Sequence, residues 1–103
     1  MVLVDYLTVL GEETRPSAVT PFEPSEIAAF RRVAQRLAGA FSSAAERTGA
    51  DLVQASTLSA GHALGSAEPW VTGFRPSMKP TPFHPNAAGM RAVADAIYDM
   101  VAS

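Results

Sequence analysis

A histidine near the C-terminus stands where its side chain could move protons. His84 is followed by Pro85 and Asn86, and an amphipathic segment begins directly after them. Pro85 biases His84 toward an extended backbone, and the Asn86 side chain can accept from the free N–H groups of a first helical turn. Imidazole is the side chain most often poised to transfer protons near neutral pH. The pattern predicts a fixed catalytic imidazole, and the competing interpretation is a capping loop whose histidine merely packs.

The elements that must position this histidine follow the order of a parallel α/β sheet. An almost continuous apolar run is typical of a strand buried on both faces, and alanine-rich segments with apolar spacings of three and four predict helices. Ser25 is the expected N-cap of the first helix and Gly49 its stop, while Asn86 caps the last helix. The predicted elements are strand 2–10, helix 26–47, strand 51–55, loop 57–85 and helix 87–101. Strand, helix and strand in this order imply parallel pairing.

Composition bounds the class of protein. With 103 residues, 48% of them hydrophobic and 17% charged, the chain fits one small globular unit and neither a disordered segment nor a coiled coil. A net charge of −2 without a run of Lys or Arg argues against a nucleic-acid partner. The sequence has no cysteine, and its two histidines lack further soft ligands, so neither a disulfide framework nor a metal site is expected. No apolar run reaches the roughly 18 residues of a membrane span, and the start lacks the features of a signal peptide.

Several segments resemble a known hydrolase family. FHPNAAGMRAVADAI, residues 83–97, is similar to the last block of the SGNH, or GDSL-type, serine hydrolases. GHALGSAEPWVTG, residues 61–73, resembles a segment of the actinobacterial esterase and lipase branch, and the first strand with AERTGADLVQAS, residues 45–56, resembles what precedes it. The resemblance implies that residues 1–103 are the C-terminal half of a flavodoxin-like, three-layer α/β/α hydrolase.

By that resemblance, His84 is the general base of a serine esterase or lipase. Many members carry an aspartate three residues before the histidine, and Thr81 stands there in this chain. The Thr81 main-chain carbonyl is then expected to orient the ring, which gives a Ser–His dyad, and Asp5 is the rival orienting group.

The expected nucleophile is missing from this chain. The family's serine lies in a Gly-Asp-Ser motif after the first strand, and the sequence contains no such motif. The resemblance therefore implies that an N-terminal half, covalently joined or separate, supplies the serine and the oxyanion hole. It also implies an ester or lipid substrate, no cofactor, and a secreted or cell-envelope location, although the cellular address stays open. The isolated chain is expected to be nearly inactive.

The predicted loop 57–85 carries large apolar side chains and the second histidine. Trp70, Phe74 and Phe83, with Met78 between them, predict either the wall of an acyl pocket or anchors that hold the loop by burial. His62 is predicted to pack with a hydrogen bond to loop backbone, and a substrate contact is the second interpretation.

An alternative function also fits the pattern. Two parallel strands alone make a weak sheet with exposed edges. The chain could therefore be a non-catalytic α/β interaction module that forms homo-oligomers through those edges. An anion site at a helix N-terminus ranks behind both, because no glycine-rich phosphate loop is present.

Overall fold

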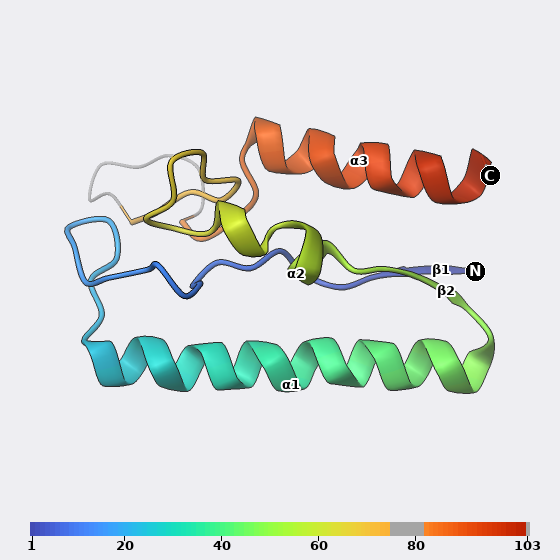
Figure 1. The fold of residues 1–103 in the computed structure, drawn as a ribbon, viewed down its shortest axis with the longest axis horizontal. Coiled ribbons are helices and arrows are strands. Elements are labelled where there is room, and N and C mark those ends of the chain that lie inside the picture. The colour runs from blue at the N-terminus through green and yellow to red at the C-terminus, as the bar shows by residue number, and fades with distance from the viewer. Residues whose placement is uncertain (75–81, 103) are drawn as a thin grey trace.

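A long helix and a shorter helix lie on opposite sides of a pair of parallel strands (Figure 1). The computed structural model describes residues 1–74 and 82–102. Strands β1 (Val2–Val4) and β2 (Asp51–Val53) pair in parallel, and helices α1 (Pro24–Thr48) and α3 (Ala87–Ala102) form the two outer layers. The predicted parallel pairing of the two strands and the general α/β class are confirmed.

Helix α1 begins two residues earlier than predicted. Glu23, and not Ser25, is its N-cap, and the Glu23 N–H donates to the Glu26 side chain at 2.9 Å. Pro24 occupies the first helical position because its fixed φ suits a helix and its missing N–H would have had no helical partner there. At the other end Gly49 adopts a left-handed φ of 70°, so the predicted glycine stop is confirmed.

Both predicted strands are too long. After β1, the chain forms hydrogen bonds to residues outside β2. The Thr8 N–H donates to Ser59 Oγ at 2.8 Å, and the Val9 carbonyl accepts from the Leu64 N–H at 3.0 Å. Strand β2 stops at Val53 because the chain turns there into helix α2 (Ala55–Leu58). The apolar run 2–10 is therefore a strand only at its start, and of its apolar side chains Leu7 is buried whereas Tyr6 is exposed.

The predicted loop 57–85 starts with helical turns. It includes the end of α2 and a 3-10 turn, η1 (Ala60–His62). Asp5, buried at the end of β1, accepts from both the Ser56 N–H at 2.8 Å and the Ser56 hydroxyl at 2.6 Å. This carboxylate satisfies donors in the first turn of α2 and thereby fixes where β2 ends.

The central apolar cluster lies beyond the ends of the strands. Leu7, Ala55, Leu64 and Val71 form it, with Phe83 among the partly buried side chains packed against it. Figure 1 shows both strands running toward this end, where residues 60–74 and 82–86 gather beside the start of α3. The core therefore anchors the loops at the carboxyl ends of the strands, which is where open α/β sheets bind ligands. Among residues 1–74 and 82–102, no helix combines the length and apolarity needed to cross a bilayer.

Candidate active site around His84

The imidazole of His84 is exposed and held by a main-chain oxygen. Its Nδ1 lies 3.0 Å from the carbonyl oxygen of Pro82. A carbonyl can only accept, so this contact requires the ring proton on Nδ1 and leaves the lone pair on Nε2. Nε2 is the atom that a general base uses when a carbonyl or carboxylate orients the other nitrogen.

The backbone of His84 is fixed by pairing with the segment that follows Trp70. The Thr72 N–H donates to the His84 carbonyl at 2.8 Å, and the Phe83 N–H donates to the Thr72 carbonyl at 2.8 Å. Val71 and Pro85 form an antiparallel bridge beside them. Pairing with the segment around Thr72 therefore fixes the backbone of His84. Pro85 further restricts the backbone dihedral angles of His84, the residue before it.

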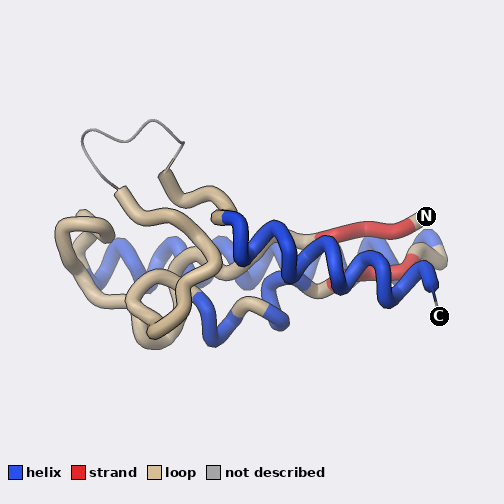
Figure 2. Tube along the Cα trace, turned by 90° about the horizontal axis from the view of Figure 1, so that it is seen from above, coloured by secondary structure: helices blue, strands red, loops and turns tan. Residues whose placement is uncertain are grey.

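Asn86 joins this site to α3. Its side-chain oxygen accepts from the Gly89 N–H at 2.9 Å, which confirms the predicted cap. Its amide nitrogen donates to the Pro69 carbonyl at 2.7 Å, and its main-chain N–H donates to the Trp70 carbonyl at 2.9 Å. One side chain thus ties the start of the helix to the loop that holds His84. Figure 2 shows loop segments gathered beside the N-terminal end of this helix.

Phe83 stands in a backbone conformation that aromatic residues rarely adopt. Its φ is +60°, the one positive value outside glycine among the described residues. Its ring packs 5.6 Å from that of Phe22, and its carbonyl accepts from the Tyr6 hydroxyl at 3.4 Å. Strained residues of this kind cluster at functional sites and persist only where the surroundings hold them. Burial raises the pKa of the Tyr6 phenol above its ordinary value, so this donor keeps its proton beyond the usual range.

The two groups expected to orient the ring have different outcomes. Thr81 lies outside the described residues, and the carbonyl found on Nδ1 is that of Pro82, one residue later. Asp5 accepts hydrogen bonds from Ser56 with both carboxylate oxygens, so the alternative prediction that Asp5 orients the His84 ring is wrong. Asp5 directly follows β1 and is buried, and its hydrogen bonds stabilise the first turn of α2.

His62 takes the packing role predicted for it. Its Nδ1 lies 2.9 Å from the Glu68 carbonyl, and its ring stacks on Trp70 with centroids 3.8 Å apart and planes 1° apart. Trp70 in turn packs against Gly89, where an added Cβ would collide with the Trp70 carbonyl oxygen. The tryptophan is thus an anchor of the loop.

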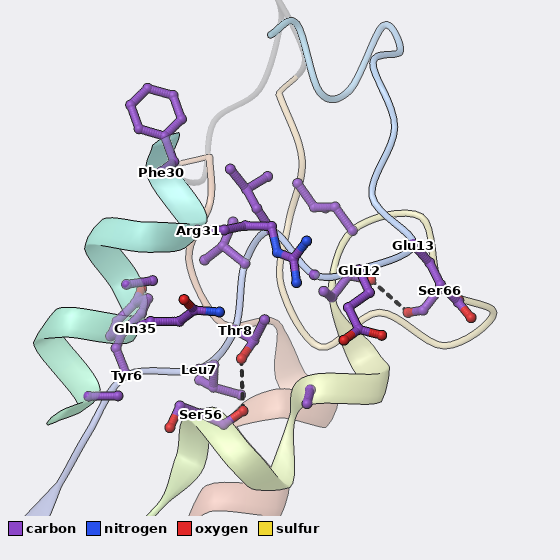
Figure 3. Close-up of a pocket in the computed structure, with 18 of the residues that line it drawn as sticks. Tyr6, Leu7, Thr8, Glu12, Glu13, Phe30, Arg31, Gln35, Ser56 and Ser66 are labelled. Carbon is purple, nitrogen blue, oxygen red and sulfur yellow. Dashed lines mark hydrogen bonds between the residues drawn. The ribbon is translucent and has the colours of Figure 1, made fainter. Parts of the chain in front are cut away.

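A groove opens between α1 and the loop side, over residues 6–13 (Figure 3). Its volume is about 980 Å³, at the upper end of the range for small-molecule sites. Phe83 lines it, whereas Trp70, Phe74 and His84 do not. Of the three predicted wall residues, the structure therefore brings only Phe83 to the groove.

The aromatic residues that accompany Phe83 were missed by the sequence interpretation. Phe22 sits in the loop before α1, Phe30 lies on α1, and Tyr6 follows β1. Phe22 packs edge-on against Phe30 with centroids 5.2 Å apart and also contacts Phe83. In the sequence, only Phe30 followed a recognisable pattern, and its helical spacing predicted burial. The contacts between these rings form only when the chain folds, so the sequence could not predict them.

No metal centre is assembled among residues 1–74 and 82–102. No three His, Asp or Glu side chains in these ranges come close enough together to hold an ion. No model of a known protein family matches the chain, and no curated protein matches it either.

Proposed function

We propose that this chain supplies the histidine of a serine ester hydrolase of the SGNH type. The observation that carries the proposal is the His84 ring, which is exposed and is held at Nδ1 by the Pro82 carbonyl, so that Nε2 carries the lone pair. Its place beyond the carboxyl ends of two parallel strands supports the same proposal, as does the FHPN sequence that leads into α3.

In the proposed reaction, Nε2 of His84 takes the proton of a serine hydroxyl as its oxygen attacks the ester carbonyl. The imidazolium then protonates the departing alcohol, and a water molecule, activated in the same way, cleaves the acyl-enzyme. The Pro82 carbonyl accepts from Nδ1–H throughout and stabilises the charged ring. A carbonyl does so less strongly than a carboxylate, so the pair works as a dyad.

The nucleophile comes from polypeptide outside residues 1–103. The sequence has no Gly-Asp-Ser motif, and four described serines outside α1 and α3 hold structural contacts: Ser17 with Thr20, Ser56 with Asp5, Ser59 with Thr8, and Ser66 with Ala63. We therefore propose an N-terminal half, joined to this chain or separate, as the partner that carries the serine and the oxyanion donors. The substrate is a carboxylic ester, and no cofactor takes part.

The test uses the product of the full reading frame that contains these residues, assayed with a 4-nitrophenyl ester. His84→Ala is expected to lower kcat by about 10³-fold or more, because loss of a catalytic base in such sites costs on that scale. His62→Ala is the matched control and should stay within about tenfold, since His62 packs on Trp70. Equal effects of the two substitutions in folded protein would contradict the proposal.

The 103-residue chain by itself should hydrolyse the same ester no faster than free imidazole. A clearly faster rate that His84→Ala abolishes would show that the nucleophile lies within this chain, contrary to the proposed division of the site.

A second candidate function is an interaction module. Within the described residues, β1 has a partner on one edge only, and Val33 and Leu37 on α1 are 61% and 50% exposed. A free strand edge and exposed apolar side chains both favour association with a second copy of the chain. Sedimentation equilibrium distinguishes this function, because a monomer at all concentrations would exclude it.

A further inference from the structure

We propose that Asn86 is a positioning residue, whose side-chain N–H₂ group keeps the His84 ring turned toward the Pro82 carbonyl. The consequence for catalysis rests on the proposed hydrolase function, whereas the hydrogen bonds of Asn86 are a feature of this chain. The argument follows those bonds from the start of α3 to the imidazole.

The two ends of the Asn86 side chain bind different segments. Its Oδ1 accepts from the Gly89 N–H at 2.9 Å, and its Nδ2 donates to the Pro69 carbonyl at 2.7 Å. A helix cap needs the oxygen alone, and aspartate and serine are about as favourable as asparagine in that role. Asparagine differs from them in carrying a separate donor atom beside the acceptor. Capping therefore explains one end of this side chain, and the bond to Pro69 is a second role.

The segment that Asn86 holds pairs with the backbone around the histidine. The Asn86 main-chain N–H donates to the Trp70 carbonyl at 2.9 Å, next to the side-chain bond to Pro69. Val71 and Pro85 then form the antiparallel bridge. The two bonds from Asn86 therefore close one end of a short pairing between residues 69–72 and 83–86.

The other end of this pairing fixes the direction of the imidazole. The Thr72 N–H donates to the His84 carbonyl, and the Thr72 carbonyl accepts from the Phe83 N–H, both at 2.8 Å. Between them stands the positive φ of Phe83, and the Pro82 carbonyl lies 3.0 Å from Nδ1 of His84. A strained turn persists only while its surroundings hold it. Loosening the pairing thus allows the ring to leave the Pro82 carbonyl.

Loss of the amide alone leaves the fold in place. The main-chain bond from Asn86 to Trp70 and the bridge between Val71 and Pro85 do not involve the side chain. A capping oxygen at position 86 also keeps the start of α3. The expected defect is therefore in the aim of the His84 ring.

Two substitutions separate the amide from the cap. Asn86→Asp and Asn86→Ser both retain a capping oxygen, and neither offers an N–H donor to the Pro69 carbonyl. Only the aspartate adds a charge, so an effect common to both variants comes from the lost donor. Long-range ¹H–¹⁵N spectra of the chain near pH 8 should show the His84 proton on Nδ1 in the original sequence and shared between both ring nitrogens in the two variants.

The kinetic test uses the product of the full reading frame and a 4-nitrophenyl ester. Both variants should lower kcat by about 10- to 100-fold, as a misplaced catalytic group does, while KM changes less than about threefold. Ala94→Gly is the matched control, because it weakens the same helix at an exposed position away from these bonds. It should leave the His84 proton on Nδ1 and kcat within about twofold.

A His84 proton that stays on Nδ1 in both position-86 variants would overturn the inference. So would an equal loss of kcat in Ala94→Gly, because the effect would then be one of helix stability. If the proton moves in both variants but the full-length product shows no His84-dependent hydrolysis, Asn86 still positions the ring and the proposed function fails.

Discussion

At the scale of single residues, the backbone of Phe83 decides how the imidazole is aimed. The left-handed turn at this position brings the Pro82 carbonyl to Nδ1 of His84. Asparagine tolerates positive φ, whereas a β-branched side chain does not, and the conformation costs an ordinary residue about 1–2 kcal/mol. The residue that presents the histidine is therefore also the one under strain.

We expect Phe83→Val to be less stable than Phe83→Asn by about 1 kcal/mol, as measured by urea denaturation. Both variants lose the ring contact with Phe22, so this loss cancels in the comparison between them. Long-range ¹H–¹⁵N spectra should show the proton of His84 on Nδ1 in Phe83→Asn and in the original chain. Its transfer to Nε2 in either would contradict the assigned turn.

The sequence was sufficient for those site residues whose roles are local. His84 and Asn86 could be placed because proline and a helix start act on adjacent residues. Tyr6, Phe22 and Phe30 could not be assigned to the groove, because the chain must fold before they meet Phe83. Asp5 was misjudged for the same reason, since Ser56 lies fifty-one residues away.

At the scale of elements, two glycines within helices have opposite roles. Gly89, in the first turn of α3, lies against the Trp70 carbonyl with no room for a Cβ, while Gly39 on α1 has nothing within 4 Å. Gly89→Ala should therefore destabilise the chain by about 1–3 kcal/mol through overpacking. Gly39→Ala should stabilise it by about 0.5–1 kcal/mol, because alanine is the better helix former. Thermal melts of the two variants in parallel provide the measurement, and equal shifts would refute the packing assigned to Gly89.

Helix prediction succeeded where strand prediction did not. The apolar spacing along α1 and α3, the stop at Gly49 and the cap at Asn86 are properties of the helices themselves, so the predicted helix bounds came within two residues of the observed ones. The strand ends depend on partners far along the chain. Ser59 and Leu64 form hydrogen bonds with backbone groups that a longer β1 would have paired with β2, and no local sequence pattern predicts these partners.

At the scale of the whole molecule, the long helix α1 buries few of its side chains against the rest of the structure. Of its residues only Ile27 and Ala45 are buried, and they lie near its two ends. The middle of the helix leaves Phe30, Val33 and Leu37 partly in water. Such a surface is expected to seek a partner, whether the proposed N-terminal half or a second copy.

We expect the isolated chain to show a concentration-dependent mass in sedimentation equilibrium. Val33→Glu should weaken association about tenfold, because it places a charge on apolar surface that association would bury. Ser43→Glu adds the same charge to an exposed position of the same helix and serves as the control. An unchanged association constant in Val33→Glu would exclude this part of α1 from the contact.

The stacking of His62 on Trp70 has an optical consequence. Trp70 is the single tryptophan of the sequence, and its indole lies parallel to an imidazole at 3.8 Å. Tryptophan emission of this chain therefore originates in the loop whose backbone pairs with His84. An unlabelled sample thus carries its own spectroscopic reporter of the stacking of His62 on Trp70.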